Sequence, residues 1–91
     1  MNLHMKTIYI RKLRYIEAQS HFLAELERAF MAGAAEVEVI HGIGTYALRK
    51  MVLKEIQSID YVEIIENHNP GSLRLRMLGP EPSLMKKYLD V

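Results

Sequence analysis

The sequence predicts an α/β domain in which a mixed four-stranded sheet carries two helices on one face. Short runs of β-branched and aromatic residues alternate with longer segments whose apolar residues recur at helical spacing, in the order β-α-β-α-β-β. Residues 67–71 (Asn-His-Asn-Pro-Gly) are turn formers, so they should join the last two strands as a hairpin. Because crossover connections are right-handed, both helices should cover the same sheet face and form a two-layer sandwich.

The first strand is predicted at residues 7–11 (Thr-Ile-Tyr-Ile-Arg), which are rich in β-branched and aromatic side chains. Strand alternation places Ile8 and Ile10 on one face and Tyr9 and Arg11 on the other. We expect Ile8 and Ile10 to point into the core.

The first helix should begin at Tyr15 and end near Gly33, a suitable C-terminal cap. A second strand follows at residues 36–40, where Val37, Val39 and Ile40 supply the β-branched residues. The apolar stripe that predicts the first helix consists of Ala18, Phe22, Leu23, Leu26, Ala29 and Phe30.

The second helix is predicted from Ala47 to about Ser58, at about the same length as the first. Strands should follow at residues 61–66 and 72–78. Beyond them, residues 79–91 form a tail with a short helix at 83–89. In the last strand, Leu73, Leu75 and Met77 should point inward, and Arg74 and Arg76 outward.

Length and composition limit the class of protein. The chain has 91 residues, enough for one domain with one hydrophobic core. It contains no cysteine, so disulfides and thiolate metal sites are excluded and a reducing compartment is expected. The apolar runs are too short to cross a bilayer and residues 1–6 lack the core of a secretion signal, which favours the cytoplasm and no membrane partner. The oligomeric state is left open.

A formal net charge of +1 does not by itself indicate a nucleic-acid-binding protein, because the overall field would be weak. The basic residues are nevertheless clustered, whereas most acidic residues fall in residues 17–38 and 60–66. The clusters are Lys6, Arg11, Lys12 and Arg14; Arg49, Lys50 and Lys54; and Arg74 and Arg76.

The bend between the second strand and the second helix has the composition of an anion site. His41 ends the strand, Gly42 and Gly44 permit a tight turn, and Thr45 can cap the helix that follows. Free backbone N–H groups at a helix start bind phosphate readily. Arg49 and Lys50 add positive charge one turn later, although glycines at this position would also serve simply to turn the chain.

Residues 41–45 (His-Gly-Ile-Gly-Thr), followed by Leu48 and Arg49, resemble the signature His-Gly-x-Gly-(Thr/Ser)-Gly-x-Leu-Arg of the Smr (small MutS-related) domain. Tyr46 stands where the family usually has its third glycine. The resemblance covers about residues 7–78 of a single domain spanning 1–91. It implies a fold similar to the C-terminal domain of translation initiation factor three, and a role with DNA or RNA, in DNA repair or recombination.

A second Smr signature, Leu-Asp-Leu-(His/Arg)-Gly, is similar to residues 8–12 (Ile-Tyr-Ile-Arg-Lys). Arg11 is retained, but Tyr9 replaces the aspartate and Lys12 replaces the glycine. In the family, this aspartate and the signature histidine are linked with nicking of DNA or cleavage of RNA. The final hairpin departs as well, since residues 69–72 (Asn-Pro-Gly-Ser) replace a Gly-Gly-x-Gly-like turn.

Loss of the aspartate argues against hydrolysis, because phosphodiester cleavage needs a positioned base, usually with a metal ion or cations. A tyrosine is a poor base at neutral pH, which leaves His41 as the candidate catalytic residue. No histidine pair has metal-site spacing, so no cofactor is expected unless the domain is a nuclease that uses a divalent metal. His68, in the hairpin, is a minor candidate for the site.

The leading hypothesis is therefore nucleic-acid binding at the bend. One alternative is a nicking endonuclease of the Smr type, and another is a protein-interaction module that uses the open sheet face. In the last case Tyr9, Arg11, Arg74 and Arg76 would share that face as a basic surface with an aromatic residue. The residues predicted to bind nucleic acid are Arg11, Lys12, His41, Gly42, Gly44, Thr45, Arg49 and Lys50.

Overall fold

The computed structural model describes residues 5–44, 46–65 and 69–78. The helix predicted at 83–89, Thr45 and His68 lie outside these residues. The order of the elements confirms the β-α-β-α-β-β prediction. They are β1 (Met5–Tyr9), α1 (Tyr15–Met31), β2 (Glu36–Ile40), α2 (Ala47–Ile56), β3 (Val62–Ile65) and β4 (Ser72–Met77).

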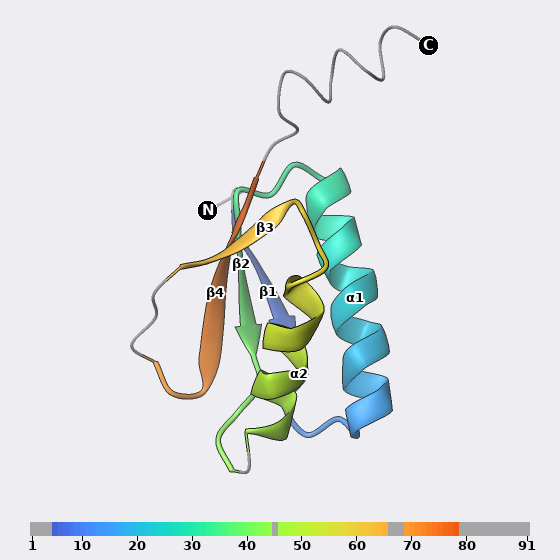
Figure 1. The fold of residues 1–91 in the computed structure, drawn as a ribbon, viewed down its shortest axis with the longest axis vertical. Helices are drawn as coiled ribbons and strands as arrows, with labels where there is room; N and C mark the ends of the chain where they lie inside the picture. The colour runs from blue at the N-terminus through green and yellow to red at the C-terminus, as the bar shows by residue number, and fades with distance from the viewer. Residues whose placement is uncertain (1–4, 45, 66–68, 79–91) are drawn as a thin grey trace, which may run out of the picture.

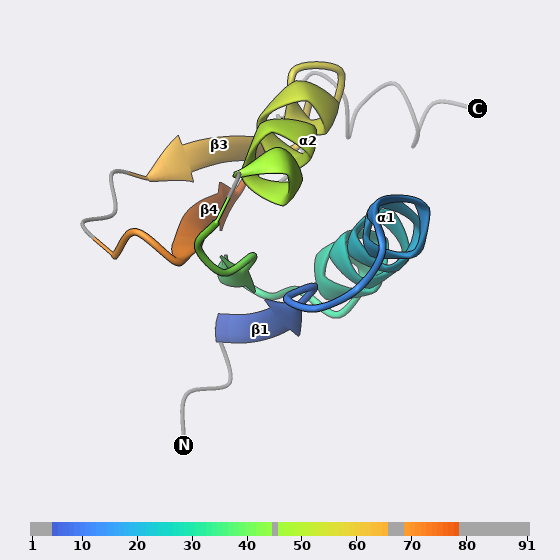
Figure 2. The ribbon, with the colours of Figure 1, turned by 90° about the horizontal axis from the view of Figure 1, so that it is seen from below.

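The four strands form one mixed sheet in the order β1-β2-β4-β3. β1 and β2 are parallel, and β4 is antiparallel to both of its neighbours, β2 and β3. Both helices lie against the same face of this sheet, as the view along the strands shows (Figures 1 and 2). The two-layer sandwich predicted from right-handed crossovers is thus confirmed.

The core lies between the sheet and the helices, and strand alternation selects its residues. Ile8 and Ile10 are buried, as predicted, together with Leu73 and Leu75 of β4. Burial of each such side chain contributes roughly 1.5–3 kcal/mol. Leu23 was expected in the helical stripe but is 36% exposed, because the neighbouring Phe22 occupies the core position. The helices add Phe22, Leu26 and Ala29 from α1, and Met51, Val52 and Ile56 from α2.

Several predicted boundaries differ from the structure, and the first strand lies two residues earlier, at Met5–Tyr9 instead of residues 7–11. β1 ends at Tyr9 rather than residue 11, because the successive N–H groups of Ile10 and Arg11 both donate to the carbonyl of Ile40. α2 has 10 residues against 17 in α1, so the expectation of equal lengths is wrong. Beyond Ile56 the chain continues in tight i→i−3 turns at residues 57–59 instead of a regular helix.

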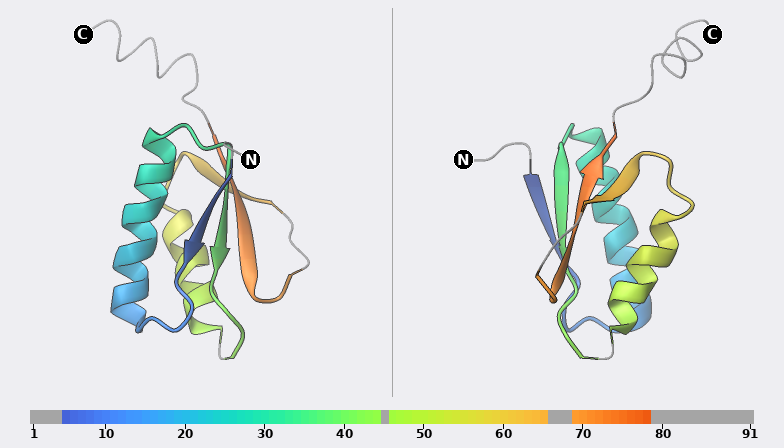
Figure 3. Two further views of the ribbon diagram at one scale, coloured as in Figure 1. Left: turned by 180° about the vertical axis from the view of Figure 1, so that it is seen from behind. Right: turned by 60° about the vertical axis from the view of Figure 1, so that its left-hand side comes forward.

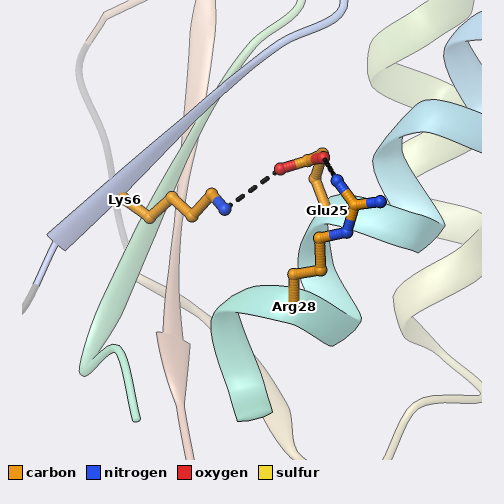
Figure 4. Close-up of polar contacts among 3 residues, drawn as sticks. All are labelled: Lys6, Glu25 and Arg28. Atoms are coloured by element: carbon orange, nitrogen blue, oxygen red, sulfur yellow. Dashed lines mark hydrogen bonds and ion pairs between the residues drawn. The ribbon is translucent and has the colours of Figure 1, made fainter. Parts of the chain in front are cut away.

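Lys6 is used to attach α1 to the sheet. Its ammonium group lies 3.0 Å from a carboxylate oxygen of Glu25, whose other oxygen lies 2.8 Å from Arg28 (Figure 4). The hydrogen bond from Lys6, and the charges of Lys6 and Arg28, lower the pKa of Glu25 below its ordinary value. The sequence analysis grouped Lys6 with Arg11 and Lys12. In the structure Lys6 pairs with Glu25 instead and is not one of the basic residues near the bend.

Candidate nucleic-acid interface

The functional candidates converge at one end of the sheet. Because β1 and β2 are parallel, their C-terminal ends lie side by side, and β4 starts there because it runs the opposite way. Figure 3 shows the starts of α1 and α2 at the same end. A hollow of about 640 Å³, within the usual range for ligand pockets, is lined there by residues 11–12, 40–43, 46–48, 69 and 71–72.

A second hollow, of about 490 Å³, lies on the side of α2. Tyr46 and Asn69 line both hollows, so the two adjoin. Arg11 and Lys12 line the first hollow, and the second is lined by Arg49 and Lys50 together with Leu53 and Pro70. The cations predicted from the sequence are therefore divided between two neighbouring hollows.

None of the described residues that line the two hollows is acidic. Among the described residues, none of Arg11, Lys12, Arg49 and Lys50 forms an ion pair. The positive charge at this end of the sheet is thus not neutralised by the described part of the chain.

Gly42 and Gly44 have positive φ angles of 79° and 125°, as the sequence predicted for the bend. At Gly42 the lack of a side chain serves a second purpose, since a Cβ there would lie 3.2 Å from Cγ of Arg11. The N–H groups of His41 and Gly42 both donate to the carbonyl of Gly71. These two N–H groups are therefore engaged within the protein. The Arg11 side chain lies against the backbone of Gly42, in the space where a ligand was expected to approach.

α2 begins at Ala47, as predicted, but its N-cap is Tyr46 rather than Thr45. The φ of Tyr46, 60°, is left-handed, and its side chain makes no capping hydrogen bond. The carbonyl of Tyr46 accepts the first helical hydrogen bond, from Lys50. No acidic residue occupies the first turn, so the partial positive charge of the helix start has no local counter-charge.

His41 is buried, with only 4% of its surface exposed, and lines the first hollow. Its Nδ1 lies 2.7 Å from the carbonyl oxygen of Gly42, while Nε2 has no hydrogen-bond partner among the described residues. Its ring meets that of Tyr46 edge-on, with centroids 6.2 Å apart.

The surroundings of His41 favour the neutral imidazole. Burial lowers the pKa of His41 below its ordinary value, and the positive charge of Arg49 acts in the same direction. The backbone of Gly42 and of Ser72 acts in the opposite direction. When Nδ1–H donates to Gly42, the neutral ring keeps an unshared electron pair on Nε2. His41 thus fixes the bend and leaves one buried nitrogen unsatisfied beside the hollow.

Tyr9, Arg11 and His41 do not all converge. Arg11 and His41 line the same hollow, but Tyr9 is 66% exposed and does not line it. Its neighbours Ile8 and Ile10 are buried on the helix side, so Tyr9 projects from the opposite, open face of the sheet.

The basic surface expected on the open face does not form. Arg76 donates to Glu63 at 3.0 Å, and Nε of Arg74 lies 3.8 Å from Glu36. Glu38, opposite Arg74 in the register of β2 and β4, accepts a hydrogen bond from Ser72. The arginines of β4 therefore face glutamates on neighbouring strands, and Arg11 packs over Gly42 instead of joining them.

The described residues contain neither a metal-binding cluster nor a membrane-crossing helix. Among them, no group of three histidine, cysteine, aspartate or glutamate side chains is arranged to hold a metal ion. Neither α1 nor α2 has the length and apolar content of a membrane-crossing helix.

Three residues before and at the start of β4, namely Asn69, Gly71 and Ser72, were not predicted as parts of the site. Gly71 holds the bend through its carbonyl, and its own N–H donates to Oδ1 of Asn69 at 2.9 Å. Tyr46, noted in the sequence only as a departure from a glycine, lines both hollows. The predicted hairpin could have indicated these residues, because a β4 strand that lies antiparallel beside β2 must begin where β2 ends.

Comparison with known proteins agrees with this geometry. The structure is similar to the crystal structure of the Smr domain of Thermus thermophilus MutS2, with a TM-score of 0.75 at 23% identity, covering 81% of this chain and 99% of that one. Endonuclease MutS2 of Fusobacterium nucleatum is 39% identical over 80 residues, 80% of this chain and 10% of the relative.

Shorter matches involve other bacteria. Endonuclease MutS2 of Lactococcus lactis is 32% identical over 57 residues, 63% of this chain and 7% of the relative. The protein of the same name from Halothermothrix orenii is 48% identical over 46 residues, 50% of this chain and 6% of the relative. This chain thus spans about a tenth or less of these relatives. The Smr domain model matches residues 8–72, and the chain therefore belongs to the Smr domain family.

Proposed function

We propose that this Smr domain binds nucleic acid at the end of the sheet, through the phosphates of DNA or RNA. One observation carries the proposal: Arg11, Lys12, Arg49 and Lys50 line two adjoining hollows, and no acidic residue of the described chain lines either of them. Arginine and lysine beside the start of a helix are the groups that proteins use to bind phosphate oxygens.

A second observation supports a ligand at this place. His41 is nine-tenths buried, and its Nε2 lacks a hydrogen-bond partner among the described residues. A buried polar atom without a partner costs free energy unless a ligand or water satisfies it. In this proposal Arg11 and Lys12 contact phosphate on one side of Tyr46, and Arg49 and Lys50 contact it on the other. The glycines Gly42 and Gly44, both with positive φ, shape the bend between them.

Fluorescence anisotropy with labelled DNA and RNA tests the proposal. If the four cations neutralise about three to four phosphates, affinity should fall roughly 10²-fold between about 50 and 200 mM salt. Arg49→Gln should weaken binding about tenfold and reduce the salt slope by about 1.

Arg76→Gln is the matched control, because it removes the same charge from an arginine that is paired with Glu63. Its affinity should stay within about twofold of the unchanged protein, since surface ion pairs leave little charge to attract a ligand. Equal losses in Arg49→Gln and Arg76→Gln would contradict a site at the sheet end. Absence of any salt-sensitive binding would instead favour the protein-interaction module on the open face.

A nicking endonuclease is the second candidate. The relatives named above are endonucleases by name, and a neutral His41 beside the hollow has the unshared electron pair that a general base needs. Against this, no carboxylate within residues 5–44, 46–65 and 69–78 lines the hollows, and Tyr9 does not line them either. Plasmid nicking that disappears in His41→Ala would support an enzyme. Nicking that survives in His41→Ala would come from another site or a contaminant.

A further inference from the structure

Two residues of the described chain other than glycine have a positive φ angle, Lys12 at 72° and Tyr46 at 60°. Both line the same hollow at the sheet end. The left-handed region is unfavourable for a residue with a Cβ, whereas glycine adopts it readily. Each of these positions would therefore be more stable, as far as the backbone is concerned, with the glycine that the Smr signatures place there.

The packing of the core does not account for the two side chains. Lys12 is exposed and forms no ion pair among the described residues, and Tyr46 is 37% exposed. Tyr46 also caps α2 without using its hydroxyl group. Backbone strain that packing does not explain is typical of functional positions, where a side chain is held for a ligand.

The position of Tyr46 indicates what kind of ligand. Its ring lines both hollows, with Arg11 and Lys12 in one and Arg49 and Lys50 in the other. An aromatic ring with cations on either side is the arrangement that binds single strands, because a base stacks on the ring while phosphates contact the cations. The bases of a duplex are stacked on each other and cannot present a face in this way.

We propose that Lys12 and Tyr46 adapt this site to single-stranded nucleic acid, with Tyr46 stacking on an unpaired base and Lys12 contacting an adjacent phosphate. This inference rests on the proposed function, since it specifies the class of nucleic acid at the same site. The buried Nε2 of His41 beside the hollow is independent support for a ligand there.

Tyr46→Gly provides the most direct test, because it removes the ring and gives the left-handed position the residue that adopts it most readily. The variant should remain folded with a Tm within about 4 °C of that of the unchanged protein, because glycine relieves the left-handed backbone while loss of the ring removes its contact with His41. Affinity for short oligomers of deoxythymidine and of uridine should fall about 5- to 100-fold, the range for loss of one stacked base. Affinity for duplex DNA should change less than about twofold, because a duplex contributes phosphate contacts only.

Controls separate stacking from other causes. Tyr46→Phe keeps the ring and should bind single strands like the unchanged protein. Tyr9→Ala removes a more exposed tyrosine that does not line the hollow, and it should leave binding unchanged. Lys12→Gly should raise the Tm. It should also weaken single-strand binding and reduce the dependence of that binding on salt. The deoxythymidine and uridine oligomers report whether DNA or RNA is preferred.

The outcomes distinguish this inference from the proposed function. If the protein binds neither single strands nor duplexes, both fail. If it binds nucleic acid but Tyr46→Gly lowers single-strand and duplex affinity equally, or lowers neither, the specific role of Tyr46 is overturned while the proposed function stands. A selective loss of single-strand binding in a folded variant supports the inference.

Discussion

The sheet end and the open sheet face carry the same kinds of basic residue in opposite electrostatic states. On the open face, Glu36 and Glu63 are the register partners of Arg76, and both arginines of β4 form ion pairs. At the sheet end, no acidic residue in the described part of the chain lines the hollows beside Arg11 and Arg49. Position relative to the strand ends accounts for the difference, because a residue inside a strand has cross-strand neighbours and a residue beyond it has none.

This difference explains how a chain with a net charge of only +1 can contain a strongly basic site. The acidic residues are used where they neutralise cations that serve the fold, as Glu25 does between Lys6 and Arg28. Among the described residues, the cations beyond the strand ends form no such ion pair. The net charge of the whole molecule is therefore a poor guide to the charge of one site. The ion pairs within the structure show where the positive charge is neutralised and where it is not.

The largest effect that tests the comparison is expected at Gly42. Gly42→Ala places a side chain at a φ of 79° and 3.2 Å from Cγ of Arg11, so it should lower the free energy of unfolding by about 1–3 kcal/mol. It should also displace Arg11 and weaken nucleic-acid binding severalfold. Urea unfolding and anisotropy measure the two effects.

Gly33→Ala is a matched control for that substitution. Gly33 has nearly the same φ, 78°, but a Cβ there would meet no atom within 4 Å. The variant should show the cost of backbone strain without any change in binding. If both variants bind nucleic acid equally well, the contact between Gly42 and Arg11 has no part in the site.

Much of the fold could be predicted from the sequence because its signals are local. The bounds of β2 agree with the prediction, since its apolar residues alternate regularly between two clear turns. The length of α2 was overestimated because Ile59 continued the apolar spacing, although the chain there forms only i→i−3 turns. Spacing alone does not distinguish a helix from a tight turn that buries the same residue.

The residues at the sheet end were predictable where they are contiguous in the chain, and Arg11 and Lys12 were predicted beside them from the family resemblance. Arg49 and Lys50 follow the bend directly, so their proximity to it required no knowledge of the fold. The pairing of Arg74 and Arg76 with glutamates depends on the register of three strands, which the sequence does not specify. Tyr9 was considered for the site because it stands where the Smr signature has its aspartate, but it projects from the open face of the sheet.

The pH dependence of stability should distinguish the buried sheet end from the rest of the surface. The pKa of His41 is lowered in the folded protein, so the unfolded chain, with a pKa near 6.5, binds the proton more readily. The contribution of the buried His41 to the free energy of unfolding is fully present above pH 6.5. It is lost as the pH falls through 6.5 toward the pKa of His41 in the folded protein. The free energy of unfolding should change through this group by no more than about 1.4 kcal/mol per pH unit.

Urea unfolding of His41→Gln between about pH 7.5 and pH 5 measures this contribution, and the variant should have a flatter profile. His21→Gln, which removes an exposed histidine of α1, should leave the profile unchanged. Glu25 does not interfere, because its lowered pKa means that its contribution is lost only at more acidic pH, below 4.5. An unchanged profile in His41→Gln would show that burial of the imidazole does not govern stability in this range.

The smallest effect is expected for the ion pairs of the open face. Arg76→Gln should lower the free energy of unfolding by only about 0.2–1 kcal/mol, and less at high salt, because both Arg76 and Glu63 are about half exposed. Arg49→Gln should leave stability unchanged or raise it slightly, since it removes a charge with no ion-pair partner among the described residues. Urea unfolding at low and high salt measures both variants. If Arg49→Gln were the more destabilising of the two, the sheet-end cations would serve the fold rather than a ligand, and the contrast between the two regions would disappear.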